Sequence, residues 1–104
     1  MKANIPIPEE QIADYCRRWK IAELALFGAV LRDDFRPDSD VDVLVRFHPD
    51  ARHTLFDMVR MQDELMRIFG REVHLVSRRA IEKSKNYLRK KTILESAKVV
   101  YGAR

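Results

Sequence analysis

Two aspartates one residue apart carry the strongest chemical signal in this sequence. Asp40 and Asp42 lie in the run Ser39-Asp40-Val41-Asp42-Val43-Leu44-Val45. Its β-branched residues predict a strand, so both carboxylates point to one face, about 7 Å apart. Such carboxylates repel, and a shared hard cation such as Mg²⁺, which proteins usually hold through one or two carboxylates plus substrate phosphates, removes the penalty. The alternative is an exposed strand end with two solvated acids.

A glycine earlier in the chain offers a matching site for an anion. Gly28 follows an apolar run, residues 21–27, that predicts a short buried strand, and it precedes a predicted helical turn over residues 30–34. Glycine lets the backbone approach a ligand closely, and the free N–H groups that begin a helix attract phosphate. Alone this signal is weak. Together with the two aspartates it predicts a metal site beside a phosphate cradle.

The surrounding elements must bring these two segments together. Apolar spacing and turn residues predict a helix–strand–helix–strand–helix–strand–helix order, which favours an α/β (α+β) fold with a small mixed sheet of three or four strands covered by helices. Thr54 is a predicted helix cap, Gly70 a predicted helix stop and Ser77 the cap of a short helix. Expected helices begin at Glu9, span 54–69, follow Ser77 and span about 87–97; expected strands span 21–27, 41–47 and 72–76.

Size and composition favour one globular domain over residues 1–104. The chain has a single cysteine, Cys16, which excludes an internal disulfide and a multi-cysteine zinc site, and its helical setting predicts a packing role. No apolar run approaches membrane-spanning length, and the first residues lack a hydrophobic signal core. We therefore expect a cytoplasmic protein with no membrane partner.

Charge is unevenly distributed along the chain. Residues 1–70 hold ten basic and thirteen acidic residues, a balance of −3, whereas residues 71–104 hold ten basic and three acidic residues, a balance of +7. A basic segment suits nucleic acid, an acidic partner protein or a triphosphate, although a solvated helix surface is the simpler interpretation. Tyr87 is the one aromatic residue in the stretch 78–91, which holds most of these basic residues, so we do not expect a nucleic-acid platform.

Three segments of the chain resemble the core signature of the DNA polymerase β-like nucleotidyltransferase superfamily, and more closely the minimal nucleotidyltransferases of bacteria and archaea. These segments are residues 27–32, residues 34–35 and residues 39–45. The likeness continues through residues 55–70, 71–77 and 93–101, so it covers nearly the whole chain. It implies a nucleotidyltransferase fold and Mg²⁺-dependent transfer of a nucleoside monophosphate, expected here as AMP from ATP, with Mn²⁺ as a second possible cofactor.

The resemblance also assigns roles to individual residues. Asp40 and Asp42 would be metal ligands and catalytic residues, while Gly28 and Ala29 would lie under the β- and γ-phosphates. Ser39 and Arg32 would also bind the nucleotide. For Arg32 an exposed ion pair with Asp33 or Asp34 is an equally simple reading.

Two positions depart from the family pattern. Ala29 stands where the family usually has serine, which removes one hydroxyl contact worth about 1.5–3 kcal/mol to a charged group but leaves the backbone N–H. His74 aligns with the third carboxylate. Three readings stay open: His74 is a substitute catalytic base, it recruits a softer metal such as Mn²⁺ or Zn²⁺, or it marks lost catalysis. Glu72 is an alternative source of the missing oxygen ligand.

The resemblance further implies a partner. Minimal nucleotidyltransferases are often paired with a small helical HEPN protein as antitoxin and toxin, with the toxin as acceptor of the nucleotide. The alternative is a weakened or inactive nucleotidyltransferase fold that neutralises its partner by contact. Apolar surface on the helices is also compatible with a homo-oligomer.

Overall fold

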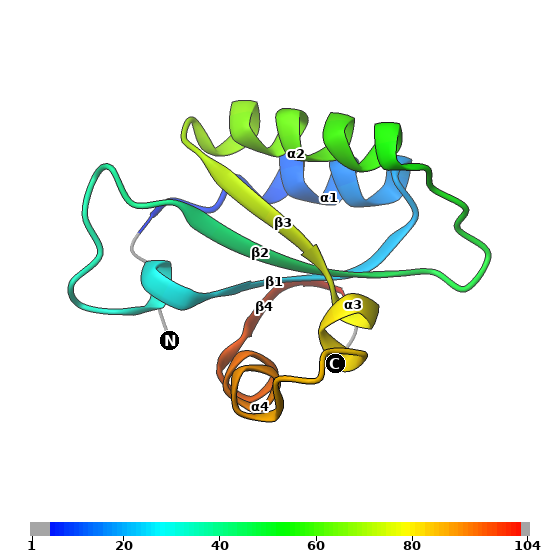
Figure 1. The fold of residues 1–104 in the computed structure, drawn as a ribbon. Coiled ribbons are helices and arrows are strands. Elements are labelled where there is room, and N and C mark those ends of the chain that lie inside the picture. The colour runs from blue at the N-terminus through cyan, green and yellow to red at the C-terminus, as the bar shows by residue number, and fades with distance from the viewer. Residues whose placement is uncertain (1–4, 103–104) are drawn as a thin grey trace.

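The structure, a computed structural model, describes residues 5–102 and shows a four-stranded sheet with helices on both faces (Figure 1). The expected α/β (α+β) architecture with a small mixed sheet is therefore confirmed. The elements in chain order are α1 (Glu9–Arg18), β1 (Ile21–Phe27), the 3-10 turn η1 (Gly28–Leu31), β2 (Val41–Phe47), α2 (Leu55–Phe69), β3 (Val73–Ser77), α3 (Arg78–Glu82), α4 (Tyr87–Ser96) and β4 (Lys98–Gly102).

The strand order β3-β2-β1-β4 places the two chemically interesting segments side by side at the centre of the sheet. β1 runs antiparallel to both β2 and β4, whereas β2 and β3 are parallel and are connected through α2. The apolar end of the chain forms the fourth strand, β4, at the sheet edge. None of the helices within residues 5–102 is both long and apolar enough to cross a membrane.

Local signals set the ends of the elements as expected, with small shifts. The Thr54 hydroxyl accepts from the Asp57 N–H at 3.1 Å while the Asp57 carboxylate accepts from the Thr54 N–H at 3.0 Å, which is a capping box at the start of α2. Gly70 ends α2 with a φ of +72°. The turn after β1 begins at Gly28 itself, two residues earlier than expected, and β3 starts one residue later.

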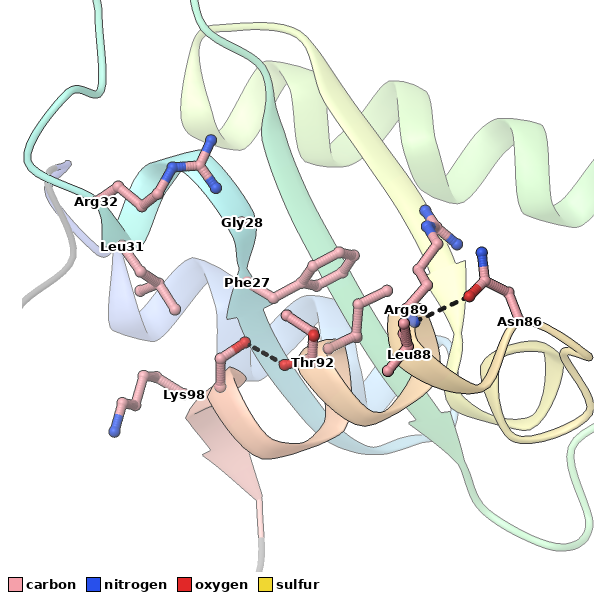
Figure 2. Close-up of a pocket in the computed structure, with 11 residues that line it drawn as sticks. Phe27, Gly28, Leu31, Arg32, Asn86, Leu88, Arg89, Thr92 and Lys98 are labelled. Atoms are coloured by element: carbon pink, nitrogen blue, oxygen red, sulfur yellow. Dashed lines mark hydrogen bonds between the residues drawn. The ribbon is translucent and has the colours of Figure 1, made fainter.

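The two faces of the sheet are covered differently. α1 and α2 lie together across one face, and the short helices α3 and α4 lie across the other (Figure 1). On this second face Phe27 points towards α4 (Figure 2), in a small cluster of buried apolar residues that includes Leu44 and Ile93. Because side chains alternate along a strand, neighbouring residues of β2 serve different faces.

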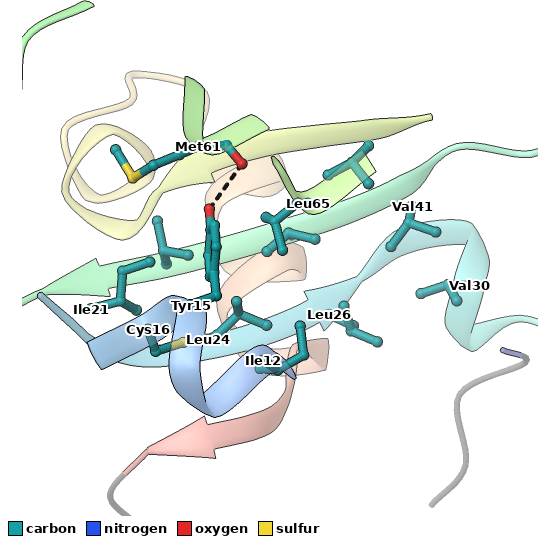
Figure 3. Packing of buried hydrophobic residues seen from close by; sticks show 13 residues of the cluster. Ile12, Tyr15, Cys16, Ile21, Leu24, Leu26, Val30, Val41, Met61 and Leu65 are labelled. Atoms are coloured by element: carbon teal, nitrogen blue, oxygen red, sulfur yellow. Dashed lines mark hydrogen bonds between the residues drawn. The ribbon is translucent and has the colours of Figure 1, made fainter. Parts of the chain in front are cut away.

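The main core lies between the sheet and the helices α1 and α2 (Figure 3). Its strand residues include Leu24, Leu26 and Val43, and Leu65 is fully buried from the α2 side. Cys16 is fully buried in the same cluster, and burial raises the pKa of its thiol to about 12, so it is a packing residue as expected.

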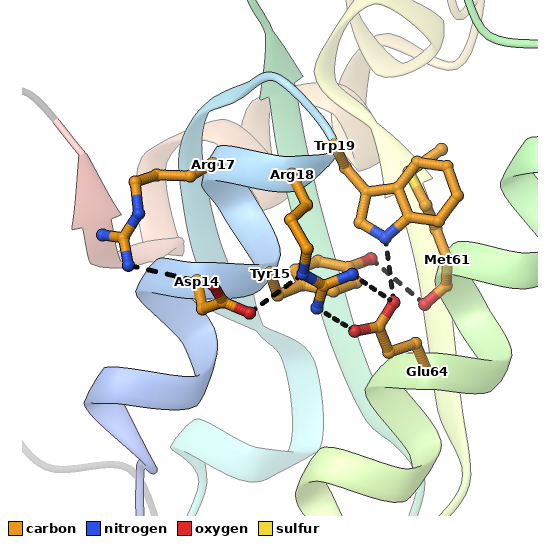
Figure 4. Close-up of polar contacts among 7 residues, drawn as sticks. All are labelled: Asp14, Tyr15, Arg17, Arg18, Trp19, Met61 and Glu64. Carbon is orange, nitrogen blue, oxygen red and sulfur yellow. Dashed lines mark hydrogen bonds and ion pairs between the residues drawn. The ribbon is translucent and has the colours of Figure 1, made fainter.

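A polar network joins α1 to α2 at the edge of this core (Figure 4). The buried Tyr15 hydroxyl donates to the Met61 carbonyl at 3.1 Å, and Trp19 Nε1 donates to Glu64 at 3.0 Å. Arg18 pairs with Glu64 as well as with Asp14. These contacts fix how the two helices sit against each other.

Candidate active site

Strand register places the predicted acids next to a histidine. In the parallel pairing of β2 and β3, Asp42 lies opposite His74, and in the antiparallel pairing with β1 it lies opposite Phe27. Asp40 immediately precedes β2. Val41 is buried on the α1–α2 face, so Asp42 points to the opposite face, which α3 and α4 cover only in part.

His74 lies between the two carboxylates. Its Nε2 is 3.2 Å from Asp40 Oδ2, and its Nδ1 is 3.4 Å from Asp42 Oδ1. Each ring nitrogen therefore lies within reach of a different carboxylate, and a neutral imidazole can donate to one of them while its other nitrogen stays an acceptor. The structure thus brings together the three side chains that the sequence marked as catalytic.

The environment of Asp42 disfavours its negative charge. Burial raises the pKa of the Asp42 carboxyl, and the neighbouring Asp40 carboxylate adds to this effect, while His74 and Arg32 oppose it. A group whose charge is poorly solvated gains most from a cation placed against it. The pair of acids is therefore a natural place for positive charge.

Gly28 packs directly against this carboxylate. Its φ is +77°, and a Cβ added at this position would lie 2.5 Å from Asp42 Oδ2. A side chain here would collide with the acid, so only glycine permits the close approach. The start of η1 therefore lies next to Asp42, which is the proximity that the predicted phosphate cradle and metal site require.

The other predicted residues divide between two hollows. Ala29 and Ser39 line a hollow of about 370 Å³ whose other lining residues are Arg36, Asp38, Asp40, Asp42 and His74. The Ser39 hydroxyl accepts from the Arg36 N–H at 3.1 Å and closes the turn before β2. Arg32 lines a second groove, and its Nε pairs with Asp34 Oδ1 at 3.3 Å, the alternative contact that the sequence suggested.

The donor set suits a hard divalent cation held by two protein carboxylates. Glu72 lines a different hollow together with Met66 and Arg71, so it does not supply a third oxygen to Asp40 and Asp42. Within residues 5–102 no three His, Cys, Asp or Glu side chains are arranged to share one ion. Two carboxylates fit Mg²⁺ when water and substrate phosphates complete its shell.

Sequence reasoning missed the contribution of α4. This helix forms one wall of the groove that Arg32 lines, through residues such as Leu88 and Thr92. No spacing rule links α4 to Gly28, because their proximity arises only when β4 pairs with β1 and carries α4 back across the sheet.

Curated relatives of this chain are named as adenylyltransferases. "Putative protein adenylyltransferase MJ0435" of Methanocaldococcus jannaschii is 31% identical over 78 residues, which cover 75% of this chain and 82% of that protein. "Putative protein adenylyltransferase MJ1379" of the same organism is 28% identical over 64 residues, and the match spans 62% of this chain and 64% of that relative.

Solved structures of similar fold include both single proteins and toxin–antitoxin complexes. A structure described as a "putative minimal nucleotidyltransferase" is 31% identical, with a TM-score of 0.65 and coverage of 86% of this chain and 85% of that one. A toxin–antitoxin with AMP-PNP gives a TM-score of 0.70 at 18% identity, covering 94% and 76% of the two chains. A complex of a tri-AMPylated Shewanella oneidensis HEPN toxin with its MNT antitoxin gives 0.60 at 18% identity, covering 91% and 70%.

A family model supplies the assignment. The model described as the nucleotidyltransferase domain matches residues 9–100, which is most of the chain and includes Gly28, both aspartates and His74. The match agrees with the fold and with the relatives, and it confirms the class of enzyme that the sequence suggested. This chain belongs to the nucleotidyltransferase domain family.

Proposed function

We propose that this chain transfers AMP from ATP to a hydroxyl group of a HEPN-type helical partner in the cytoplasm, and that it thereby acts as the antitoxin of that partner. The names of the curated relatives and the AMPylated toxin in one complex of similar fold support this reaction. The single observation that carries the proposal is the contact between Gly28 and Asp42, because it joins an anion cradle to a pair of acids.

Asp40 and Asp42 would hold the divalent cation, Mg²⁺ or Mn²⁺. When bound, such an ion neutralises charge on the triphosphate and on the transferring phosphoryl group. The chain itself supplies the rest of the site. The backbone N–H groups of Gly28 and Ala29 would donate to phosphate oxygens, and Ser39 would help to fix the turn that positions Asp40.

The transfer needs one proton acceptor. The acceptor hydroxyl oxygen attacks the α-phosphorus and forms a new P–O bond, while the bond from that phosphorus to the bridging oxygen breaks and pyrophosphate leaves with the electron pair. The hydroxyl proton passes to a ring nitrogen of His74, in its neutral form. His74 is 60% exposed, so an incoming acceptor can reach its ring.

Label transfer from ATP tests the proposal. With ATP radiolabelled at the α-phosphate, Mg²⁺ or Mn²⁺, and the HEPN-type partner, we expect label on the partner. The double variant Asp40→Asn with Asp42→Asn should lower the rate by about a hundredfold or more, since both charges that hold the cation are lost. Asp38→Asn is the matched control, because Asp38 lines the same hollow but is highly exposed and pairs with Arg36. Absence of label with the wild-type protein would contradict the proposal.

A second function is favoured by one observation. His74 already supplies the acids with two nitrogen contacts, and Ala29 lacks the usual hydroxyl, which together suit a fold that neutralises its partner by contact alone. In that case the double aspartate variant would still suppress the toxicity of the partner. If it binds the partner and fails to suppress toxicity, the chemistry is required.

A further inference from the structure

A groove of about 960 Å³ opens beside the candidate active site, between η1 and α4 (Figure 2). Gly28 lies in its wall, while the next residue, Ala29, lines the hollow that holds the acids. The groove and the hollow therefore meet at the backbone of the predicted phosphate cradle. Whatever occupies the groove can be continuous with a phosphate chain held at Gly28.

The walls of the groove are mainly apolar. Phe27 and Ile93, each 6% exposed, line it. Leu31 faces α4 from η1 (Figure 2). Leu88 is 74% exposed and stands at the mouth. Apolar walls with a few polar groups are the usual composition of a site for a small organic molecule, and a volume near this one falls within the usual range.

The same groove is lined by polar groups that can form hydrogen bonds with the edge of a heterocycle. The Asn86 side-chain oxygen accepts from the Arg89 N–H at 3.1 Å, which leaves the amide NH₂ of Asn86 to donate to a ligand. Thr92 lines the same groove, and its side-chain hydroxyl is a further group that can donate to or accept from a ligand. Both kinds of group are needed to bind the edge of a nucleobase.

The charge of the groove is entirely positive. Arg32, Arg89 and Lys98 line it, and among residues 5–102 no Asp or Glu does. Planar guanidinium groups stack on aromatic rings as well as pairing with phosphate. An occupant with a flat, largely apolar ring and attached negative charge matches these walls.

We propose that this groove binds the nucleoside part of the triphosphate, with the base between η1 and α4 and the phosphates passing over Gly28 towards Asp40 and Asp42. The inference rests on the proposed function, since it takes the same ATP as substrate. It adds that α4 selects a nucleotide over inorganic triphosphate, and that α4 rather than the acid hollow provides this selectivity.

Comparison of two ligands tests the inference by binding alone. Calorimetry with AMP-PNP and with inorganic tripolyphosphate, each with Mg²⁺, should show that the wild-type protein binds AMP-PNP about tenfold or more tightly. Thr92→Trp should fill the groove and remove this preference while tripolyphosphate affinity stays within about twofold. Val59→Trp is the matched control, because Val59 is also an exposed β-branched helical residue (59% exposed) but lies on α2, and the preference should persist.

Each outcome decides between separate conclusions. Equal affinity of the wild-type protein for both ligands, or an unchanged preference in Thr92→Trp, would overturn the groove inference and leave the proposed function standing. Binding of neither ligand would overturn the proposed function itself. If Thr92→Trp proves unfolded by circular dichroism, Leu88→Ala replaces it, with Leu55→Ala as its control at 84% exposure. Leu88→Ala should then weaken AMP-PNP by several-fold and leave tripolyphosphate unchanged; an unchanged AMP-PNP affinity overturns the groove inference.

Discussion

The two faces of the sheet divide stability from chemistry. On the α1–α2 face, strand residues such as Leu26 and Val43 are fully buried against Leu65. On the α3–α4 face, a smaller apolar cluster around Phe27 gives way within one strand to a partly exposed acid, Asp42. Binding sites need exposed polar groups, whereas a core needs their exclusion, so one strand can serve both needs only by alternating its side chains.

The difference shows how a chain of this size holds an electrostatically unfavourable site. The carboxylates of Asp40 and Asp42 repel each other, and Asp42 is partly buried. Gly28, the first residue of η1, takes a left-handed backbone conformation where it approaches Asp42. These costs fall on the face that contributes less to the core. The α1–α2 face carries the main cluster and the helix-joining network and can hold β2 in place while its other side remains open (Figure 4).

The largest expected effect is a difference between the two faces in how much a leucine side chain contributes to the free energy of unfolding. Leu65→Ala removes a fully buried side chain from the main core and should lower the free energy of unfolding by about 2–5 kcal/mol. Leu88→Ala removes the same atoms from an exposed position on α4 and should change it by less than about 0.5 kcal/mol. Urea unfolding followed by circular dichroism measures both. Similar losses in the two variants would contradict the assignment of stability to the α1–α2 face.

A pair of glycines sharpens the comparison by isolating the contact between η1 and Asp42. Gly28→Ala introduces a left-handed alanine and a Cβ 2.5 Å from Asp42 Oδ2, and we expect triphosphate binding to be lost with about 1–3 kcal/mol of stability. Gly70→Ala has a similar φ but nothing within 4 Å of its Cβ, so it should cost about 1 kcal/mol and leave binding intact. Equal effects on binding would show that backbone strain alone, rather than the collision, disturbs the site.

Sequence reasoning reached the parts of this structure that depend on short-range periodicity. The alternation in β2 predicted that Asp40 and Asp42 share one face of the strand, and the glycine and cap signals predicted most element ends, because these features are decided by residues a few positions apart. Sequence reasoning could not predict that Arg18 and Trp19 contact Glu64. These residues are about 45 positions apart and meet only when α1 packs on α2.

The same limit applies to the candidate site. Asp40, Asp42 and Gly28 could be predicted because their spacing and residue types resemble a known signature, and His74 could be aligned with the next strand. That both ring nitrogens of His74 face the acids follows from the parallel register of β2 and β3. The groove beside α4 follows from the pairing of β4, which no local pattern specifies.

Replacement of His74 tests whether the site beside Asp40 and Asp42 binds Mg²⁺ better with a carboxylate at this position. His74→Asp puts a third carboxylate beside Asp40 and Asp42, so Mg²⁺ affinity should rise by about tenfold because the site gains an oxygen ligand and negative charge. Calorimetric titration with Mg²⁺ measures this change, and His74→Asn is the control that adds an oxygen without charge. If affinity rises while AMP transfer falls, His74 acts as the base; if affinity falls, the histidine is an adaptation to a different ion.

The smallest effect concerns the polar network on the closed face and its dependence on pH. Hydrogen bonding from Arg18, followed in effect by that from Trp19, lowers the pKa of Glu64 relative to the unfolded chain. A lowered pKa contributes stability above the ordinary glutamate value of about 4.3, and this contribution disappears as pH falls through the folded pKa. Because Arg18 is about half exposed, the contribution should be no more than about 1 kcal/mol. Glu64→Gln should therefore be less stable than the wild-type protein at pH 7, and this difference in stability should be smaller at pH 3. Thermal unfolding at both pH values measures the difference. If the difference is the same at both, Glu64 acts through packing rather than charge.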